Sequence, residues 1–242
     1  GQDIELEFQK INKQIVFIIN DLEMWWERKE SGTQVILRII DWVKKFSKKV
    51  LFVININKYS LKLVHQLTQI QSWSISTITC NGFDARHLRD MILLRHKAGG
   101  MSFSIGKKHE SEMNAWDQAR LFNRYFDISK GNPGFAINLW IASITKVSGR
   151  TIYMKKPEPL DTSFLLKLSK EQYFYLLQFV YHMRLSVDNL SDILQTDRTM
   201  IENKVLNLWQ SGILTEKFPG VYAINAPLHQ AIIKKMVEMN LL

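Results

Sequence analysis

The feature that most constrains this chain is an apolar run near its start, Ile15–Ile19, which leads directly into Asn20, Asp21 and Glu23. An unbroken apolar run of this length predicts a central strand of a parallel sheet that is buried on both faces. The polar residues that follow would then lie at the carboxyl edge of the sheet. The run therefore predicts an α/β fold that presents carboxylates at one sheet edge.

Strand-like and helix-like segments alternate through the first hundred residues. A second apolar run, Val50–Asn57, also ends in polar residues. The other expected elements are a helix over Thr33–Lys48, a helix that Ser60 caps and that extends to about Gln69, a strand over Ser74–Cys80 and a helix over Phe83–His96. Alternation of apolar strands with helices indicates a parallel sheet with right-handed crossovers. Three strands make only part of a doubly wound domain.

The rest of the chain is predominantly helical in pattern. The expected elements are helices over 113–126 and 133–147, a short strand over 151–156, a proline linker over Lys156–Pro159, helices over 169–183, 187–194 and 197–210, a hairpin that turns at Pro219-Gly220, and a closing helix over 228–239. Three helices followed by a hairpin are typical of a winged helix. We therefore predict three domains, over 1–100, 101–156 and 157–242.

Composition limits the classes of protein to which this chain can belong. The chain has 242 residues, 46% of them apolar and 23% charged, which is ordinary for a globular protein. No apolar run reaches the roughly 18 residues of a membrane span. A single cysteine, Cys80, excludes an internal disulfide and favours a cytoplasmic location. The net charge is +9, and residues 83–157 hold 13 Lys and Arg against 6 Asp and Glu, so the middle of the chain could meet phosphates, nucleic acid or an acidic partner.

In this order, the acid-ended strand, the strand ending at Asn57, the third strand, the helical segment and the winged helix resemble an AAA+ ATPase, most closely the initiator and STAND-like branches. The resemblance implies a partial parallel-sheet P-loop ATPase core, a helical lid and a C-terminal winged helix. In that family the Walker A loop precedes the acidic strand, and only fourteen residues precede Ile15. The segment Gly100–Lys108 has five residues between its glycines and Lys108 at the Ser/Thr position, so it is rejected as that loop. The resemblance thus implies the C-terminal part of an ATPase.

The resemblance also assigns roles to the polar strand ends. Asn20 stands where the Walker B motif has its metal-organising Asp, and Asp21 stands where the family polarises the attacking water. Shifting the frame by one makes Asp21 the metal residue and leaves Glu23 beyond the usual second position. Asn57 matches the sensor 1 residue near the γ-phosphate, with Asn55 as the alternative. An Asn in place of the Asp lends no charge to Mg²⁺, so hydrolysis is expected to be weak or lost.

Further residues of the family's nucleotide site are expected in the middle of the chain. Arg95 is the candidate arginine finger, with Arg86 and Arg89 as competitors. Asn132 lies in the segment that resembles sensor 2, where the family's Arg is absent but a helix N-terminus could face a phosphate. The implied cofactors are ATP and Mg²⁺, bound by the full-length protein only. The chain itself is expected to bind nucleotide weakly or not at all.

The expected recognition helix of the winged helix exposes Arg198, Asn203 and Lys204, which are candidate nucleic-acid contacts. Residues 161–242 hold eight basic and eight acidic residues, and a neutral module binds DNA poorly because phosphate neutralisation dominates affinity. Docking to protein is therefore the favoured role. Two alternatives stay open: a non-enzymatic winged-helix module that binds nucleic acid or protein, and a hydrolysis-deficient nucleotide switch.

Overall fold

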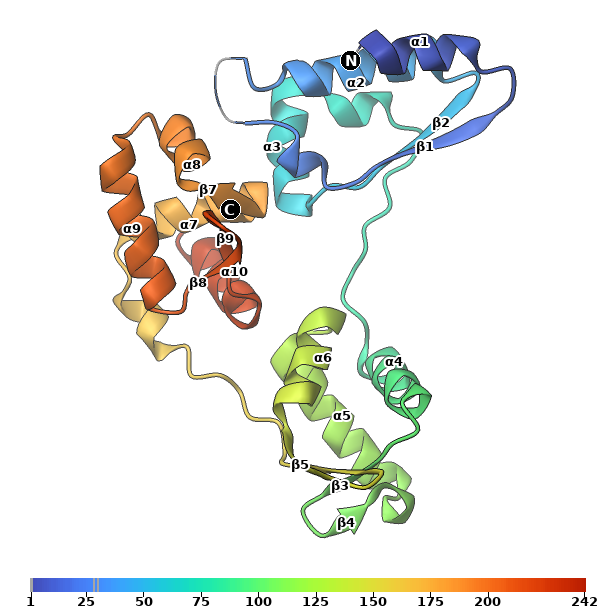
Figure 1. Cartoon of the computed structure of the whole chain (residues 1–242), viewed down its shortest axis with the longest axis vertical. Coiled ribbons are helices and arrows are strands. Elements are labelled where there is room, and N and C mark those ends of the chain that lie inside the picture. Colours follow the sequence, from blue (N-terminus) through green and yellow to red (C-terminus); the bar gives the residue numbers. More distant parts are fainter. Residues whose placement is uncertain (1, 28, 30) are drawn as a thin grey trace. The chain divides into compact units, whose positions relative to one another are not determined.

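The computed structural model describes residues 2–27, 29 and 31–242, and the chain divides into two compact units (Figure 1). The first unit combines residues up to Thr79 with Phe164–Leu242, and the second is Cys80–Ser163. The structure therefore groups residues 80–100 with the segment that follows them, whereas the sequence suggested a boundary after residue 100. No described helix is both long and apolar enough to cross a membrane.

The N-terminal part of the first unit is a two-stranded parallel sheet with helices on one face. The strands β1 (Ile15–Ile19) and β2 (Val50–Ile54) pair in parallel, with Ile15 opposite Val50 and Ile19 opposite Ile54. The helices of this part are α1 (Gln2–Lys10), α2 (Gln34–Phe46) and α3 (Lys58–Thr68). Phe8 of α1 is buried among the rings of Phe17, Phe52 and Trp42. The predicted parallel pairing of the two apolar runs is confirmed.

The other face of this sheet is open, so the prediction of a strand buried on both faces is wrong. Val16 and Ile18 are 58% and 60% exposed, and Leu51 and Val53, their partners across the ladder, are 53% and 44% exposed. Each strand alternates between this face and the core face, as its period of two requires. The described helices pack against only one side of the sheet, which leaves an apolar surface on the other.

The segment after α3 also departs from expectation. Residues 74–80 form no strand, and Ile75 and Ile78 are 96% and 86% exposed. The segment has the composition of a strand, but strand structure needs a neighbouring backbone to hydrogen-bond, and no described strand pairs with it. The predicted cap was also wrong: the residue that caps α3 is Asn57, whose side chain accepts from the Tyr59 N–H, and not Ser60.

The C-terminal part of the first unit has a core of its own, in which Leu176, Val180, Ile201 and Ile232 are fully buried. Its strands form an antiparallel sheet in the order β7-β9-β8. The elements, which include the predicted helices and hairpin, are η4 (Ser163–Lys167), α7 (Lys170–His182), β7 (Arg184–Ser186), α8 (Val187–Leu194), α9 (Arg198–Gln210), β8 (Leu214–Phe218), β9 (Val221–Ile224), η5 (Ala226–Leu228) and α10 (His229–Glu238).

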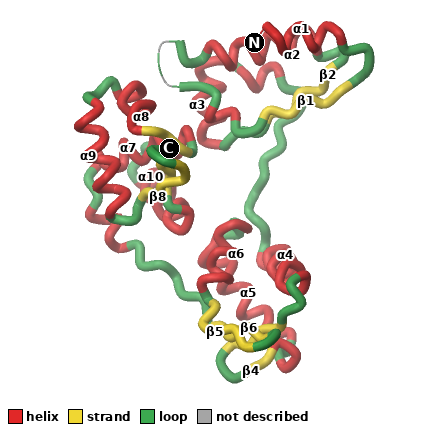
Figure 2. The backbone as a smooth tube through the Cα atoms, viewed as in Figure 1, coloured by secondary structure: helices red, strands yellow, loops and turns green. Residues whose placement is uncertain are grey.

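The second unit is a four-stranded sheet, in the order β4-β3-β6-β5, packed on three helices (Figure 2). Its elements are α4 (Ala85–Ala98), β3 (Ser102–Ile105), β4 (Lys108–His109), η3 (Glu110–Glu112), α5 (Ala115–Ser129), α6 (Pro133–Ala142), β5 (Ile144–Ser148) and β6 (Thr151–Met154). The sequence predicted β6 but missed β3. It also extended α6 through 147, whereas the helix ends at Ala142 and β5 begins at Ile144.

Candidate functional site

The polar residues that end β1 and β2 meet at one edge of the sheet, as the sequence predicted. The Asn55 N–H donates to the Ile19 carbonyl (2.8 Å), and the Leu22 N–H donates to the Asn55 carbonyl (3.0 Å). Beyond these bonds the Asn57 N–H donates to Oε2 of Glu23 (3.1 Å). The backbone thereby places Asp21, Glu23 and Asn57 at the carboxyl ends of two adjacent parallel strands. This is the position at which α/β proteins usually bind ligands.

Glu23 is the buried acid of this edge, although sequence reasoning set it aside. Its side chain is 3% exposed. Burial raises the pKa of the Glu23 carboxyl above 4.5; the charge of Asp21 acts in the same direction, and hydrogen bonds from the Glu23 and Asn57 backbone amides oppose it. Glu23 lies in a short helical turn, Leu22–Met24, whose first residue Leu22 is also buried, and no local sequence pattern marks this turn.

Asn57 is one of the residues that join this edge to the C-terminal part of the unit. Its Oδ1 accepts from the Tyr59 N–H (2.9 Å), and its Nδ2 donates to the carbonyl of Val180 (3.0 Å) and approaches Sδ of Met183 (3.5 Å). The Ser60 hydroxyl likewise donates to the carbonyl of Tyr181. The last carbonyls of a helix have no partner within the helix, so these two side chains cap the C-terminal turn of α7.

Other polar contacts extend the same junction. His182, the last residue of α7, is buried; its Nδ1 lies 3.2 Å from the Glu23 carbonyl oxygen, and its ring centroid is 5.0 Å from that of Trp26. On α8, Nδ2 of Asn189 donates to Oε1 of Glu27 (2.6 Å). Glu27 also pairs with Lys29, and this hydrogen bond is the largest of the effects that lower the pKa of Glu27. The carboxyl edge of the sheet is therefore a polar interface with α7 and α8.

Asn20, Asp21 and Asn55, the alternative to Asn57, are the members of the predicted site that remain exposed at this edge. Asp21 has φ of +51°, in the left-handed region, and the Asn20 carbonyl accepts from Nε1 of Trp25 (3.1 Å). Among the described residues there is no group of three His, Cys, Asp or Glu that could hold a metal. Mg²⁺ is commonly held by one or two carboxylates together with waters and substrate phosphates. At this edge Asp21 is the exposed carboxylate, and the exposed Asn20 precedes it in the chain.

The nucleotide-contacting residues predicted in the middle of the chain lie in the second unit. Arg95 is exposed near the end of α4. Of its two competitors, Arg86 is exposed and Arg89 hydrogen-bonds Asp90 (2.7 and 2.8 Å). Asn132 is the N-cap of α6, and its Oδ1 accepts from the Phe135 N–H (2.9 Å). Arg95 and Asn132 thus belong to the second unit, whereas Asp21 and Asn57 belong to the first.

The candidate nucleic-acid contacts lie on α9, and acids engage two of the three. The Arg198 guanidinium donates to Asp188 (2.6 Å) and Glu202 (3.1 Å), and Nζ of Lys204 lies 3.3 Å from Glu171. Asn203 is exposed. Because their charges are already compensated within the protein, Arg198 and Lys204 offer little net positive potential to a phosphate backbone.

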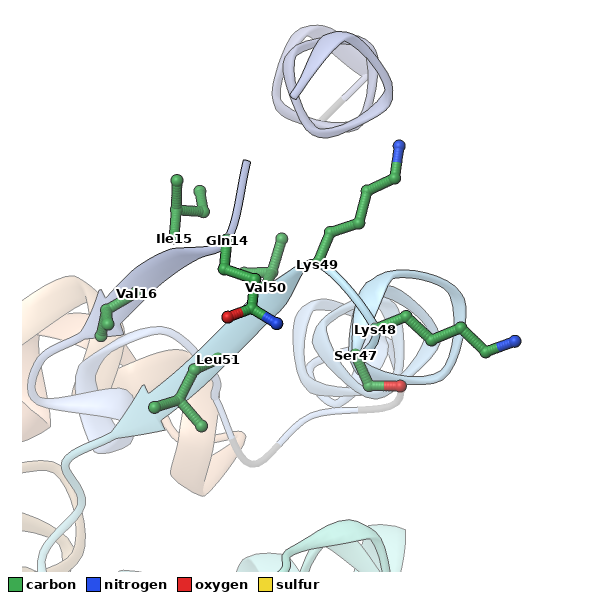
Figure 3. A pocket seen from close by; sticks show the side chains of 8 residues that line it. All are labelled: Gln14, Ile15, Val16, Ser47, Lys48, Lys49, Val50 and Leu51. Atoms are coloured by element: carbon green, nitrogen blue, oxygen red, sulfur yellow. The ribbon is translucent and has the colours of Figure 1, made fainter. Parts of the chain in front are cut away.

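An open pocket of about 310 Å³ lies at the opposite, amino ends of β1 and β2 (Figure 3). It is lined by Gln14, Ile15, Val16, Ser47, Lys48, Lys49, Val50 and Leu51. Figure 3 shows the Lys48 and Lys49 side chains extending away from the strands, and Nζ of Lys49 donates to the Ile11 carbonyl (3.2 Å). This pocket contains none of the predicted site residues.

Comparison with known proteins gives little beyond the structure itself. The sequence matches no family profile and no curated protein. Similar solved structures include RuvB from Thermotoga maritima, described as a Holliday junction branch migration motor, at 11% identity and a TM-score of 0.38, and a variant of it at 12% and 0.41. Each alignment covers 95% of this chain and 74% of the other. A likeness this weak assigns neither a fold family nor an activity.

Proposed function

We propose that this chain is the C-terminal part of an AAA+ ATPase-like protein and that its carboxyl sheet edge couples nucleotide to the C-terminal module, residues 164–242. We further propose that this module is a winged helix. The observation that carries the proposal is the hydrogen bond of Asn57, which the resemblance assigns to sensor 1, to the Val180 carbonyl of α7 at 3.0 Å. One side chain at the expected nucleotide edge thus contacts the module directly.

In the full-length protein ATP would supply the transferable phosphoryl group, with Mg²⁺ polarising it. Asp21 would hold the metal or orient the attacking water, because it is exposed at the strand end. Asn20 would hydrogen-bond a metal-bound water without adding charge. The Asn57 amide NH₂ has two N–H donors, and both are engaged by the end of α7, one by the Val180 carbonyl and one by Sδ of Met183. A γ-phosphate that recruited this donor would remove a cap from α7.

This competition defines a two-state element. In one state Asn57 and Ser60 cap the last turn of α7, and in the other Asn57 turns to the nucleotide. A hydrogen bond of this kind is worth about 1 kcal/mol net, so a nucleotide contact of ordinary strength suffices to shift the balance. The module would then loosen from, or shift against, the sheet edge.

The charge of the module supports docking over DNA binding as its role. Arg198 and Lys204 are compensated by Asp188, Glu202 and Glu171. The module's contacts with the sheet edge are instead polar and specific, as in the bond from Asn189 to Glu27. A second candidate function, a nucleotide switch that does not hydrolyse, is favoured by Asn20, which stands where the family's metal-organising Asp is expected.

The test uses the protein encoded by the full open reading frame. Mg-ATP should bind it and should increase hydrogen exchange in residues 180–182, the end of α7, and Asp21→Asn should abolish both effects. Asn203→Ala, which changes an exposed residue of α9, is the control and should alter neither. If the full protein binds no Mg-ATP, or binds it with unchanged exchange in α7, the proposal fails. Binding of Mg-ATP with increased exchange in α7 but without measurable turnover would favour the non-hydrolysing switch.

A further inference from the structure

The outer face of the sheet in the second unit is basic and carries an exposed aromatic ring. The segments that build this sheet, residues 101–109 and 144–156, contain six Lys and Arg and no Asp or Glu. Lys108 pairs with Asp117 (2.9 Å). For the other five, Lys107, Lys146, Arg150, Lys155 and Lys156, no carboxylate lies within 4 Å in the part of the chain that the structure describes.

The register of the strands defines which side chains share this face. Phe103, Ile152 and Met154 point to the core formed with the helices, and all three are buried. Tyr153 lies between Ile152 and Met154 and therefore points to the opposite face, where it is 41% exposed. Lys146 of β5 stands directly across the ladder from it.

Further basic residues extend this face along the strand direction. Arg150 is in the turn before β6, and Lys155 follows β6 in the same alternation as Tyr153. Lys107 is in the turn between β3 and β4, at the end of the sheet where Ile105 pairs with Met154. At about 3.3 Å per residue, Arg150 and Lys155 lie about 16 Å apart with Tyr153 between them. The result is a stripe of positive charge with an aromatic ring near its middle.

We propose that this stripe binds single-stranded nucleic acid. Lys and Arg side chains without a carboxylate partner complement a phosphate backbone. Because these segments carry basic residues and no acidic ones, the partner we infer is a polyanion. An exposed ring on a sheet face offers a stacking platform that only an unpaired base can use, because bases within a duplex are already stacked. In this arrangement a base stacks on Tyr153 while Lys146, Arg150, Lys155 and Lys107 contact phosphates. The surface lies in the second unit and does not depend on the proposed nucleotide function.

The test is binding of a fluorescein-labelled oligothymidylate to this chain, followed by anisotropy at several salt concentrations. Four phosphate contacts predict a slope of log K against log salt of about −3. Tyr153→Leu should weaken binding at least about fivefold, whereas Tyr153→Phe should keep it, since stacking needs the ring alone. Arg150→Ala, which changes a turn residue, should reduce the magnitude of the slope by about 0.7.

The control variant is Lys234→Ala, which removes an exposed charge of the first unit and should leave binding unchanged. Tighter binding of a duplex of the same length would overturn the proposal, as would equal affinity of the Leu and Phe variants at position 153. Equal effects of Arg150→Ala and Lys234→Ala would overturn it too, because they would reduce the interaction to overall charge.

Discussion

The double role of Asn57 leads to a prediction in which two substitutions of one residue have separable effects. Asn57→Ala removes the cap of α3, a loss of about 1 kcal/mol. It also removes the donor to the Val180 carbonyl, a further loss of about 1 kcal/mol. The expected destabilisation of the first unit is therefore about 2 kcal/mol. Asn57→Asp keeps the acceptor for the Tyr59 N–H and loses only the donor.

The Asp variant should nevertheless be clearly destabilised at neutral pH. Its carboxylate would face the Val180 carbonyl at the C-terminal end of α7, where a negative charge is unfavourable. The lost bond costs about 1 kcal/mol relative to Asn132→Asp, which shares the favourable placement of a negative charge at a helix N-terminus. Acidification should reduce this cost, because a protonated carboxyl again has a donor for the carbonyl.

Asn132 supplies the matched control. It caps α6 through the same Asn Oδ1 to N–H bond, to Phe135, and it is exposed at the helix N-terminus. Asn132→Asp should therefore be neutral or slightly stabilising, since Asp caps as well as Asn and its charge suits this end of a helix. Urea denaturation gives the free energies of unfolding, and hydrogen exchange assigns each change to its unit. If Asn57→Asp proves as harmless as Asn132→Asp, the bond to α7 does not hold the junction.

Two further predictions concern a buried acid and a glycine. The raised pKa of Glu23 means that its negative charge destabilises the folded protein above that pKa, and that this destabilisation vanishes below 4.5. Glu23→Gln should therefore stabilise the protein at pH 7, and the gain in stability should shrink to zero on acidification. A gain that does not change with pH in urea titrations would contradict this. Gly131 has φ of +79°, and a Cβ at this position would lie 2.2 Å from the Phe83 carbonyl oxygen, so Gly131→Ala should destabilise the protein by more than about 2 kcal/mol. Gly149, at φ of +57°, has nothing within 4 Å of such a Cβ, so Gly149→Ala should destabilise it by about 1 kcal/mol. Equal decreases in melting temperature for the two variants would refute the clash.

The sequence predicted those elements whose stability is decided locally or by one apolar face. The parallel pairing of Ile15–Ile19 with Val50–Ile54 follows from their apolar pattern and from the helix between them. The strand expected over residues 74–80 failed because strand structure depends on a partner, and the residues themselves cannot supply one. Ser60 was the predicted cap for a related reason: Asn57 belongs by its sequence to the strand, and only the chain's turn at that point shows that it caps α3.

The sequence predicted where the candidate site lies in the fold, but it did not predict which contacts the side chains of the site make. The sequence placed Asp21 and Asn57 at one edge, and the backbone ladder brings them there. It gave no sign that Val180 would take the Asn57 amide, since the two residues are 123 positions apart. Long-range polar contacts of this kind have no local sequence pattern. Each of the last carbonyls of any helix lacks a partner within the helix and can accept such a bond.

The engagement of Asn57 also sets a limit on how this edge can act on a nucleotide. If the nucleotide-competent state requires Asn57 to leave Val180, nucleotide binding loses about 1 kcal/mol with that hydrogen bond. The apparent affinity for the nucleotide is then about fivefold weaker. A variant that lacks the contact with α7 does not lose this free energy when the nucleotide binds. Weakening α7 against the edge, for instance by Ser60→Ala, should therefore tighten nucleotide binding in the full-length protein while destabilising the junction. Opposite signs in the two measurements are expected of a switch, whereas a residue that serves the fold alone would lower both.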